Sequence, residues 1–174
     1  DWVQSLDWSQ DGKTWVAAAL QGSRSKLLLS NSANPKWRVL WTDSLEKKDI
    51  RFVPGSQSVV YVYSAVLDSL QIIGSPSSSL GQINGIARLD LTPNAKPLSL
   101  VESNEEVIAS PLPLLGGKLV WLSDLSGYRI RFMGRWDQTV QGPEALPPVA
   151  LNLAWHEAGV LGNHMLLGPE EFTS

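Results

Sequence analysis

Residues 5–17, Ser5-Leu-Asp-Trp-Ser-Gln-Asp-Gly-Lys-Thr-Trp-Val-Ala17, decide the predicted fold of this chain. Short runs typical of strands flank Asp11-Gly12, and an Asp-Gly pair tolerates the positive φ that a tight hairpin needs. Trp8 stands just before the turn, where one large apolar side chain can cover the junction of strand and turn. The stretch therefore predicts two antiparallel strands joined by a tight turn.

The same order of aromatic residue, glycine turn and strand recurs along the chain. Its members are Trp8 with Gly12, Phe52 with Gly55, Gly116-Gly117 with Trp121, and Trp155 with Gly159. Trp8 and Phe52 lie about 44 residues apart, and the four-stranded blades of β-propellers repeat every 40–45 residues. The repeat therefore predicts a β-propeller.

Short apolar runs bounded by turn residues fill the rest of the sequence, and helical patterning is nearly absent. The best helical candidate is Ser64–Ile73. Runs at intervals of about 8–12 residues are typical of all-β domains. The predicted strands are Trp15–Leu20, Lys26–Leu29, Trp37–Trp41, Ile50–Val53, Ser58–Ser64, Ile86–Leu91, Pro97–Val101, Leu119–Leu122, Tyr128–Met133, Leu151–Trp155 and His164–Leu167. Further hairpin turns are predicted at Asn84-Gly85, Gly116-Gly117 and Ser126-Gly127.

We expect one all-β domain over residues 1–174, a partial β-propeller of about three and a half four-stranded blades, with a β-sandwich as the alternative. The blades are expected at residues 2–45, 46–103, 104–146 and 147–174, and the last has room for only two strands. The second carries an insertion, because Gly74–Gly81 is rich in serine and has no periodicity. Since an open sheet edge leaves backbone groups unpaired, the remaining blades are expected from sequence outside this chain or from another chain.

The segment Leu6–Ala17 resembles the repeat of the Tol-type and WD-like β-propellers, in which a strand ends in Trp-Ser-Pro-Asp-Gly-Lys and the next strand follows at once. Gln10 stands here in place of the usual proline, and other units keep only fragments such as Phe52-Val-Pro-Gly55. The propeller domain of bacterial surface lipoproteins is similar in its degenerate repeats. The resemblance implies a propeller fold and favours an extracytoplasmic location, in the periplasm or at the cell surface. It implies no particular activity.

The composition excludes several kinds of chemistry. The chain has no cysteine, which rules out disulfides, thiolate catalysis and cysteine-bound zinc. Its net charge is −3 and its basic residues are scattered, so we expect no nucleic-acid partner. No run of about 18 apolar residues occurs, so we expect no transmembrane segment.

The histidines and paired acids do not predict a metal, a cofactor or a catalytic site. The only histidines are His156 and His164. Glutamates lie near them in sequence (Glu157, Glu170 and Glu171), but a zinc site needs three or four converging ligands. The adjacent pairs Glu105-Glu106 and Glu170-Glu171 would point to opposite faces of a strand. We therefore expect ordinary turn and surface residues.

No nucleophile or phosphate-binding loop is predicted either. The chain has no Gly-x-Ser-x-Gly sequence. Gly12-Lys13-Thr14 matches the end of a phosphate-binding loop, but Asp7 stands where the first glycine of that loop belongs. A hairpin turn explains these residues better.

The tryptophans divide into two groups. Trp8, Trp15, Trp121 and Trp155 occupy repeat-equivalent or strand-interior positions and are expected in the core. Trp37 and Trp41 are expected on one face of a single strand, together with Val39. With Trp136 they could stack on sugars.

We expect a non-catalytic binding or scaffolding role, in which a propeller face engages a protein or a peptide. The alternative is a propeller domain accessory to a hydrolase, as in prolyl-peptidase-like enzymes, or a lactonase-like propeller with a central metal. The first strands offer Asp7, Arg51, Ser110 and Asn152, which do not make a metal cage. The second alternative is a carbohydrate-binding β-sandwich that uses Trp37, Trp41 and Trp136.

Overall fold

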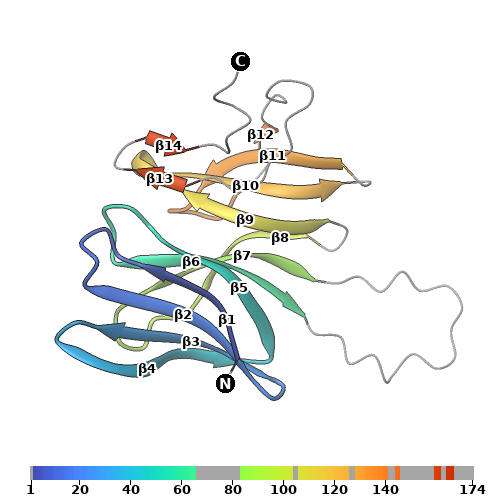
Figure 1. The fold of residues 1–174 in the computed structure, drawn as a ribbon. Coiled ribbons are helices and arrows are strands. Elements are labelled where there is room, and N and C mark those ends of the chain that lie inside the picture. The colour runs from blue at the N-terminus through green and yellow to red at the C-terminus, as the bar shows by residue number, and fades with distance from the viewer. Residues whose placement is uncertain are drawn as a thin grey trace, which may run out of the picture.

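The computed structural model describes residues 2–65, 83–103, 106–125, 128–140, 144–145, 159–161 and 164–166. All of its regular elements are strands, apart from one short 3-10 turn, η2, at Leu115–Gly117 (Figure 1). The prediction of an all-β fold is therefore confirmed.

The strands form three four-stranded antiparallel sheets, and in each of them neighbours in sequence are neighbours in space. Sheet 1 contains β1 (Trp2–Trp8), β2 (Thr14–Gln21), β3 (Arg24–Asn31) and β4 (Asn34–Asp43). Sheet 2 contains β5 (Leu45–Phe52), β6 (Ser58–Ala65), β7 (Asn84–Asp90) and β8 (Leu98–Ser103). Sheet 3 contains β9 (Val107–Pro113), β10 (Lys118–Leu125), β11 (Tyr128–Arg135) and β12 (Glu144–Ala145). A separate hairpin pairs β13 (Gly159–Leu161) with β14 (His164–Leu166).

The three sheets are layered face on face, with sheet 2 between sheets 1 and 3 (Figure 1). The first core lies between sheets 1 and 2 and includes Val16, Leu27 and Tyr61. The second lies between sheets 2 and 3 and includes Val62 and Trp121. The first strands of the sheets are neighbours, since β5 lies beside both β1 and β9. Both faces of β6 are therefore buried, which explains its unbroken apolar sequence.

Two of the predicted turns are present and one is wrong. Gly12 and Gly116 have φ values of 68° and 76° in the turns that follow β1 and β9. Asn84-Gly85 instead begins β7 and is buried. A Cβ on Gly85 would lie 2.2 Å from the carbonyl oxygen of Val101 and 2.7 Å from the Tyr63 hydroxyl. This glycine is needed for close packing inside a sheet and not for a turn.

Several predictions fall outside the described residues. They are the turn at Ser126-Gly127, the insertion at Gly74–Gly81, most of the helical candidate Ser64–Ile73, the strand Leu151–Trp155, and the position of Trp155.

The structure confirms one predicted core tryptophan and corrects two others. Trp121 is 2% exposed and its ring stacks on Phe132 with a centroid distance of 6.0 Å. Trp8 is 59% exposed, because it lies on a face of sheet 1 that no described residue covers. Its prediction as a core residue was therefore wrong. Trp15 pairs with Trp8 on the same face and is only half-buried, so its prediction as a core residue was also wrong.

A β-bulge in β4 changes the predicted grouping of Trp37 and Trp41. Leu27 pairs with Trp41 and Leu28 pairs with Val39, so Leu40 is the extra residue of the bulge. Trp41 consequently turns toward the core between sheets 1 and 2, whereas Val39 points away from it. The prediction that Trp41 shares a face with Val39 and Trp37 was wrong.

Candidate functional site

A groove opens at the end of the sheets where the first hairpin turns of sheets 1 and 2 lie. Its volume is about 980 Å³. The first strands of all three sheets end in its wall, at Trp8, Phe52 and Pro113. Because these strands are neighbours, three separate parts of the sequence build one concave surface.

Asp7 is the carboxylate inside this groove. Its Oδ2 accepts the backbone N–H of Phe52 at 2.8 Å, which joins β1 to β5 across the two sheets. Burial raises the pKa of Asp7, and this effect exceeds the lowering by hydrogen bonds from the backbone and by the charge of Arg51. The groove therefore holds a half-buried carboxylate that is poorly compensated by the protein itself.

The sheet register places three residues at the same level of the groove. Asp7 pairs with Val16 in sheet 1, Arg51 pairs with Val60 in sheet 2, and Leu112 pairs with Val120 in sheet 3. An acid, a base and an apolar side chain thus occupy equivalent positions on β1, β5 and β9.

The rim of the groove adds two further charges. Trp8 lines the groove at the end of β1, and Arg38 reaches it from β4. Asp11 lies in the turn after β1, where the Ser9 hydroxyl at 2.6 Å and the N–H of Lys13 at 3.0 Å lower the pKa of its carboxyl. Such a surface suits charge-assisted hydrogen bonds to an extended polar chain.

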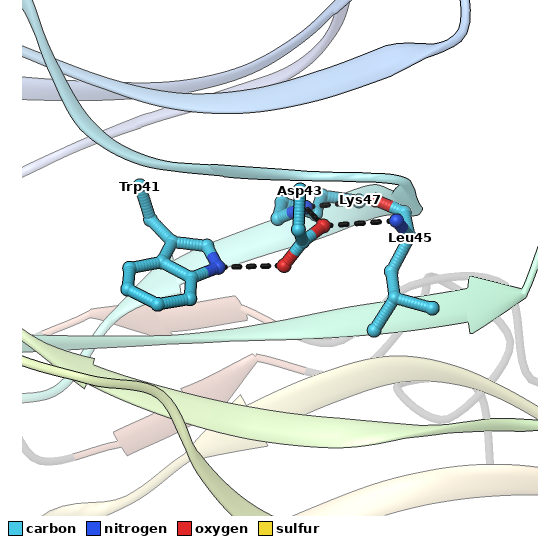
Figure 2. Close-up of polar contacts among 4 residues, drawn as sticks. All are labelled: Trp41, Asp43, Leu45 and Lys47. Atoms are coloured by element: carbon cyan, nitrogen blue, oxygen red, sulfur yellow. Dashed lines mark hydrogen bonds and ion pairs between the residues drawn. The ribbon is translucent and has the colours of Figure 1, made fainter.

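A second polar cluster lies at the opposite end, where the chain passes from sheet 1 to sheet 2 (Figure 2). Asp43 accepts the indole Nε1–H of Trp41 at 2.6 Å and the N–H of Leu45 at 2.9 Å, and also pairs with the ammonium of Lys47. The same ammonium donates to the carbonyl oxygen of Leu45 at 2.7 Å. Lys47 is fully buried, and this burial lowers its pKa. Every group in this cluster has a partner within the protein, and the cluster links β4 of sheet 1 to β5 of sheet 2.

Sequence reasoning missed the role of Lys47 in this cluster, because only the fold shows that its stem is buried. The one available signal was the short spacing of Trp41, Asp43 and Lys47 around Ser44, the single residue between β4 and β5. Arg38 was also missed as a groove residue, since β4 and β1 are far apart in sequence.

The acids and histidines considered as metal ligands do not cluster in the described part of the chain. No three of the described His, Asp and Glu residues lie close enough to hold a metal ion. His156 and Glu170-Glu171 lie outside the described residues, and the side chain of His164 is not described. The carboxylate of Glu106, just before β9, accepts a hydrogen bond from the hydroxyl of Ser123 on β10.

Two of the four first-strand residues considered as ligands of a metal cage, Asp7 and Arg51, lie together in the groove. Ser110 lies in a bulge of β9 with a φ of 50°, and its N–H donates to Asp49 of β5 at 3.0 Å. Asn152 is outside the described residues. Ser110 therefore links two first strands through its backbone.

The three tryptophans weighed for sugar stacking are not brought together. Trp41 is bonded to Asp43, and the indole Nε1–H of Trp136 donates to the carbonyl oxygen of Leu114 at 2.9 Å. The guanidinium carbon of Arg88 lies 5.6 Å from the centroid of the Trp136 ring. Trp37 is half exposed on β4.

The described residues include no helix with the length and apolarity needed to cross a membrane.

Comparison with known proteins gives a fold relationship. No family model and no curated protein matches the chain. A solved structure of a puromycin-hydrolyzing peptidase from Mycobacterium tuberculosis matches 95% of this chain with a TM-score of 0.63 and 14% sequence identity. The chain spans only 27% of the length of that peptidase. This likeness shows a shared fold over that part.

Proposed function

We propose that this chain forms three blades of a β-propeller, with further blades supplied by sequence outside it or by another chain, and that it is a non-catalytic binding module. Three observations support the propeller. Each sheet is a four-stranded meander, the first strands of the sheets are neighbours, and the sheets are layered in sequence order. Three layers fit a propeller better than the two layers of a sandwich.

The proposed partner is a protein or peptide segment that lies in the groove. The observation that carries this proposal is the half-buried carboxylate of Asp7, with Arg38 and Arg51 on the same walls. An extended peptide offers N–H groups for a carboxylate and carbonyl groups for a guanidinium. The groove is also lined by the turns between strands, which are the usual binding elements of such a scaffold.

A peptide-binding measurement tests the proposal. A pool of fluorescent decapeptides is screened against the chain by anisotropy, and the best binder is titrated into variants. Asp7→Asn and Arg38→Gln are each expected to weaken binding about tenfold, since each removes one charged partner of the peptide. Arg24→Gln is the matched control, because Arg24 is exposed on the same sheet and lies outside the groove wall.

Equal affinity in all three variants would show that the peptide binds elsewhere and would contradict the proposed groove. No binder in the pool, at concentrations up to about 1 mM, would contradict a peptide-binding function.

The likeness to the peptidase favours a second candidate, a propeller domain accessory to a hydrolase. The chain corresponds to about a quarter of that enzyme by length, which leaves room there for other domains. We propose that in this case the groove would select peptides for a catalytic domain elsewhere. Incubating the bound peptides with the intact protein separates the candidates, because only the accessory role predicts cleavage of the peptides.

A further inference from the structure

The face of sheet 1 that points away from sheet 2 is rich in exposed apolar side chains. We call it the open face. Cross-strand pairing defines three rows on it, which are Val3–Ala19–Lys26, Leu6–Ala17–Leu28–Val39 and Trp8–Trp15–Ser30. Trp37 shares the face of Val39, because the two are separated by one residue on the same strand. Lys26 is the only charged residue in these rows.

The exposure of this face is unusual for such side chains. Five of the large hydrophobic residues that remain exposed lie on it: Val3 at 56%, Leu6 at 46%, Trp8 at 59%, Trp37 at 49% and Val39 at 52%. Contiguous apolar surfaces of this kind mark sites of interaction. In Figure 1 no described strand lies on this side of sheet 1.

Sheets 2 and 3 show what covers the equivalent face elsewhere in the molecule. Trp15, Val59 and Leu119 are equivalent, because each pairs with the end of the first strand of its sheet. Two residues further on stand Ala17, Tyr61 and Trp121. Tyr61 and Trp121 are each 2% exposed, and both are covered by the preceding sheet.

The covering side chains have the same chemistry in both cases. Sheet 1 covers sheet 2 with Val16 and Ala18 of β2, and sheet 2 covers sheet 3 with Val60 and Val62 of β6. All four are 0% exposed and lie on the second strand of their sheet. A covering face is therefore aliphatic and uncharged along its second strand.

We propose that the open face of sheet 1 docks against the aliphatic face of a fourth four-stranded antiparallel sheet of the same build, located outside this chain. This inference rests on the proposed propeller and names the surface that receives the next blade and the chemistry of that blade. The fourth sheet carries two small or branched aliphatic residues on its second strand, at the positions of Val16 and Ala18.

A second copy of this chain is a poorer occupant, because it has no such face to offer. The aliphatic face of sheet 1 is occupied by sheet 2, and that of sheet 2 by sheet 3. The equivalent residues of sheet 3, Val120 and Leu122, are only 3% and 4% exposed. The cover of the open face therefore comes from a different sequence.

Thiol protection tests the docking, and peptide mapping follows the introduced cysteine, which is the only one within residues 1–174. Val39→Cys places one thiol on the open face of the intact protein, as its source organism makes it. Val107→Cys is the matched control, because Val107 is 53% exposed and lies on sheet 3. The reaction rate with a soluble thiol reagent is compared between the native and urea-unfolded protein. We expect at least about tenfold protection of Val39→Cys and little for Val107→Cys, because a docked sheet excludes the reagent.

Each other outcome overturns the inference in a recognisable way. Full reactivity of Val39→Cys shows that nothing covers the face. Protection that disappears on dilution assigns the face to a second copy, and protection that requires an added polysaccharide assigns it to a glycan.

A structure of the intact protein separates this inference from the proposed propeller. If the structure contains further radial sheets while Val39→Cys stays reactive, only the docking surface is wrong. If it contains no further sheet, the propeller is wrong as well.

Discussion

The two ends of the sheets hold carboxylates in contrasting surroundings. Asp43, where the chain passes from sheet 1 to sheet 2, receives hydrogen bonds from Trp41, Leu45 and Lys47. Asp7, in the groove, receives the backbone N–H of Phe52 and has a raised pKa because burial outweighs its partners. Both side chains connect sheets 1 and 2. Asp43 lies in a cluster of protein partners, whereas Asp7 lines a groove.

This contrast distinguishes a structural polar cluster from a candidate binding site. A buried polar group whose partners are all supplied by the protein stabilises one arrangement of the chain. A carboxylate with uncompensated burial and solvent access can gain a partner when a ligand arrives. Asp43 should therefore govern stability and Asp7 should govern binding.

Removing Asp43 is expected to have the largest effect. Asp43→Ala leaves the fully buried ammonium of Lys47 with the Leu45 carbonyl as a hydrogen-bond partner but without a carboxylate, and also frees two N–H donors. Removing one partner of a buried ion pair is strongly destabilising, because the other charge stays buried. We therefore expect a loss of about 3 kcal/mol in the free energy of unfolding. Urea denaturation at pH 7 measures it, and a loss under about 1 kcal/mol would contradict the interpretation as a structural polar cluster.

Removing the other partner of the pair should cost much less. In Lys47→Met, Asp43 keeps its two N–H donors and remains 29% exposed, so its charge stays solvated. Methionine also fills the volume of the buried stem. We expect a change within about 1 kcal/mol at pH 7, because the desolvation of Lys47 offsets much of its attraction to Asp43.

The pH dependence of this difference provides the check. Burial lowers the pKa of Lys47 below 10.5, so in that range the unfolded chain binds the proton more tightly than the folded chain does. Stability conferred by this residue therefore rises as the pH increases from the lowered pKa toward 10.5. The difference between wild type and Lys47→Met should grow in favour of wild type from pH 7 to 10. A constant difference would mean that burial does not shift this group.

The strands could be predicted from the sequence more accurately than the face of the sheet on which each side chain lies. Short apolar runs bounded by turn residues suffice to find strands such as β2 and β6, because both signals are local. Asn84-Gly85 was wrongly predicted as a turn. Glycine is needed at position 85 because Val101 and Tyr63 pack closely against it, and both are distant from it in sequence. The bulge at Leu40 likewise reversed the face of Trp41 without any local sign.

The candidate site was harder to predict than the fold. Asp7 and Arg51 were recognised as residues of first strands, but their meeting in one groove depends on the contact between β1 and β5. Arg38 joins them only because β4 folds back in the same sheet. Lys47 was not recognised, because a buried lysine and an exposed lysine look the same in a sequence and only its short spacing from Trp41 and Asp43 pointed to it.

The smallest expected effect on stability belongs to Asp7, and this makes it the most informative variant for function. In Asp7→Asn the amide oxygen can still accept the N–H of Phe52, so we expect a change below about 1 kcal/mol at pH 7.

The sign of its pH dependence follows from the raised pKa of Asp7. The folded chain binds this proton more tightly than the unfolded chain does, so the stability it confers is present below pH 3.8 and is lost as the pH rises through the raised pKa. Measured by urea denaturation, Asp7→Asn should therefore gain stability relative to wild type between pH 3.5 and pH 7. A relative loss over this range would mean that Asp7 is compensated as fully as Asp43, and the contrast between the two ends of the sheets would disappear.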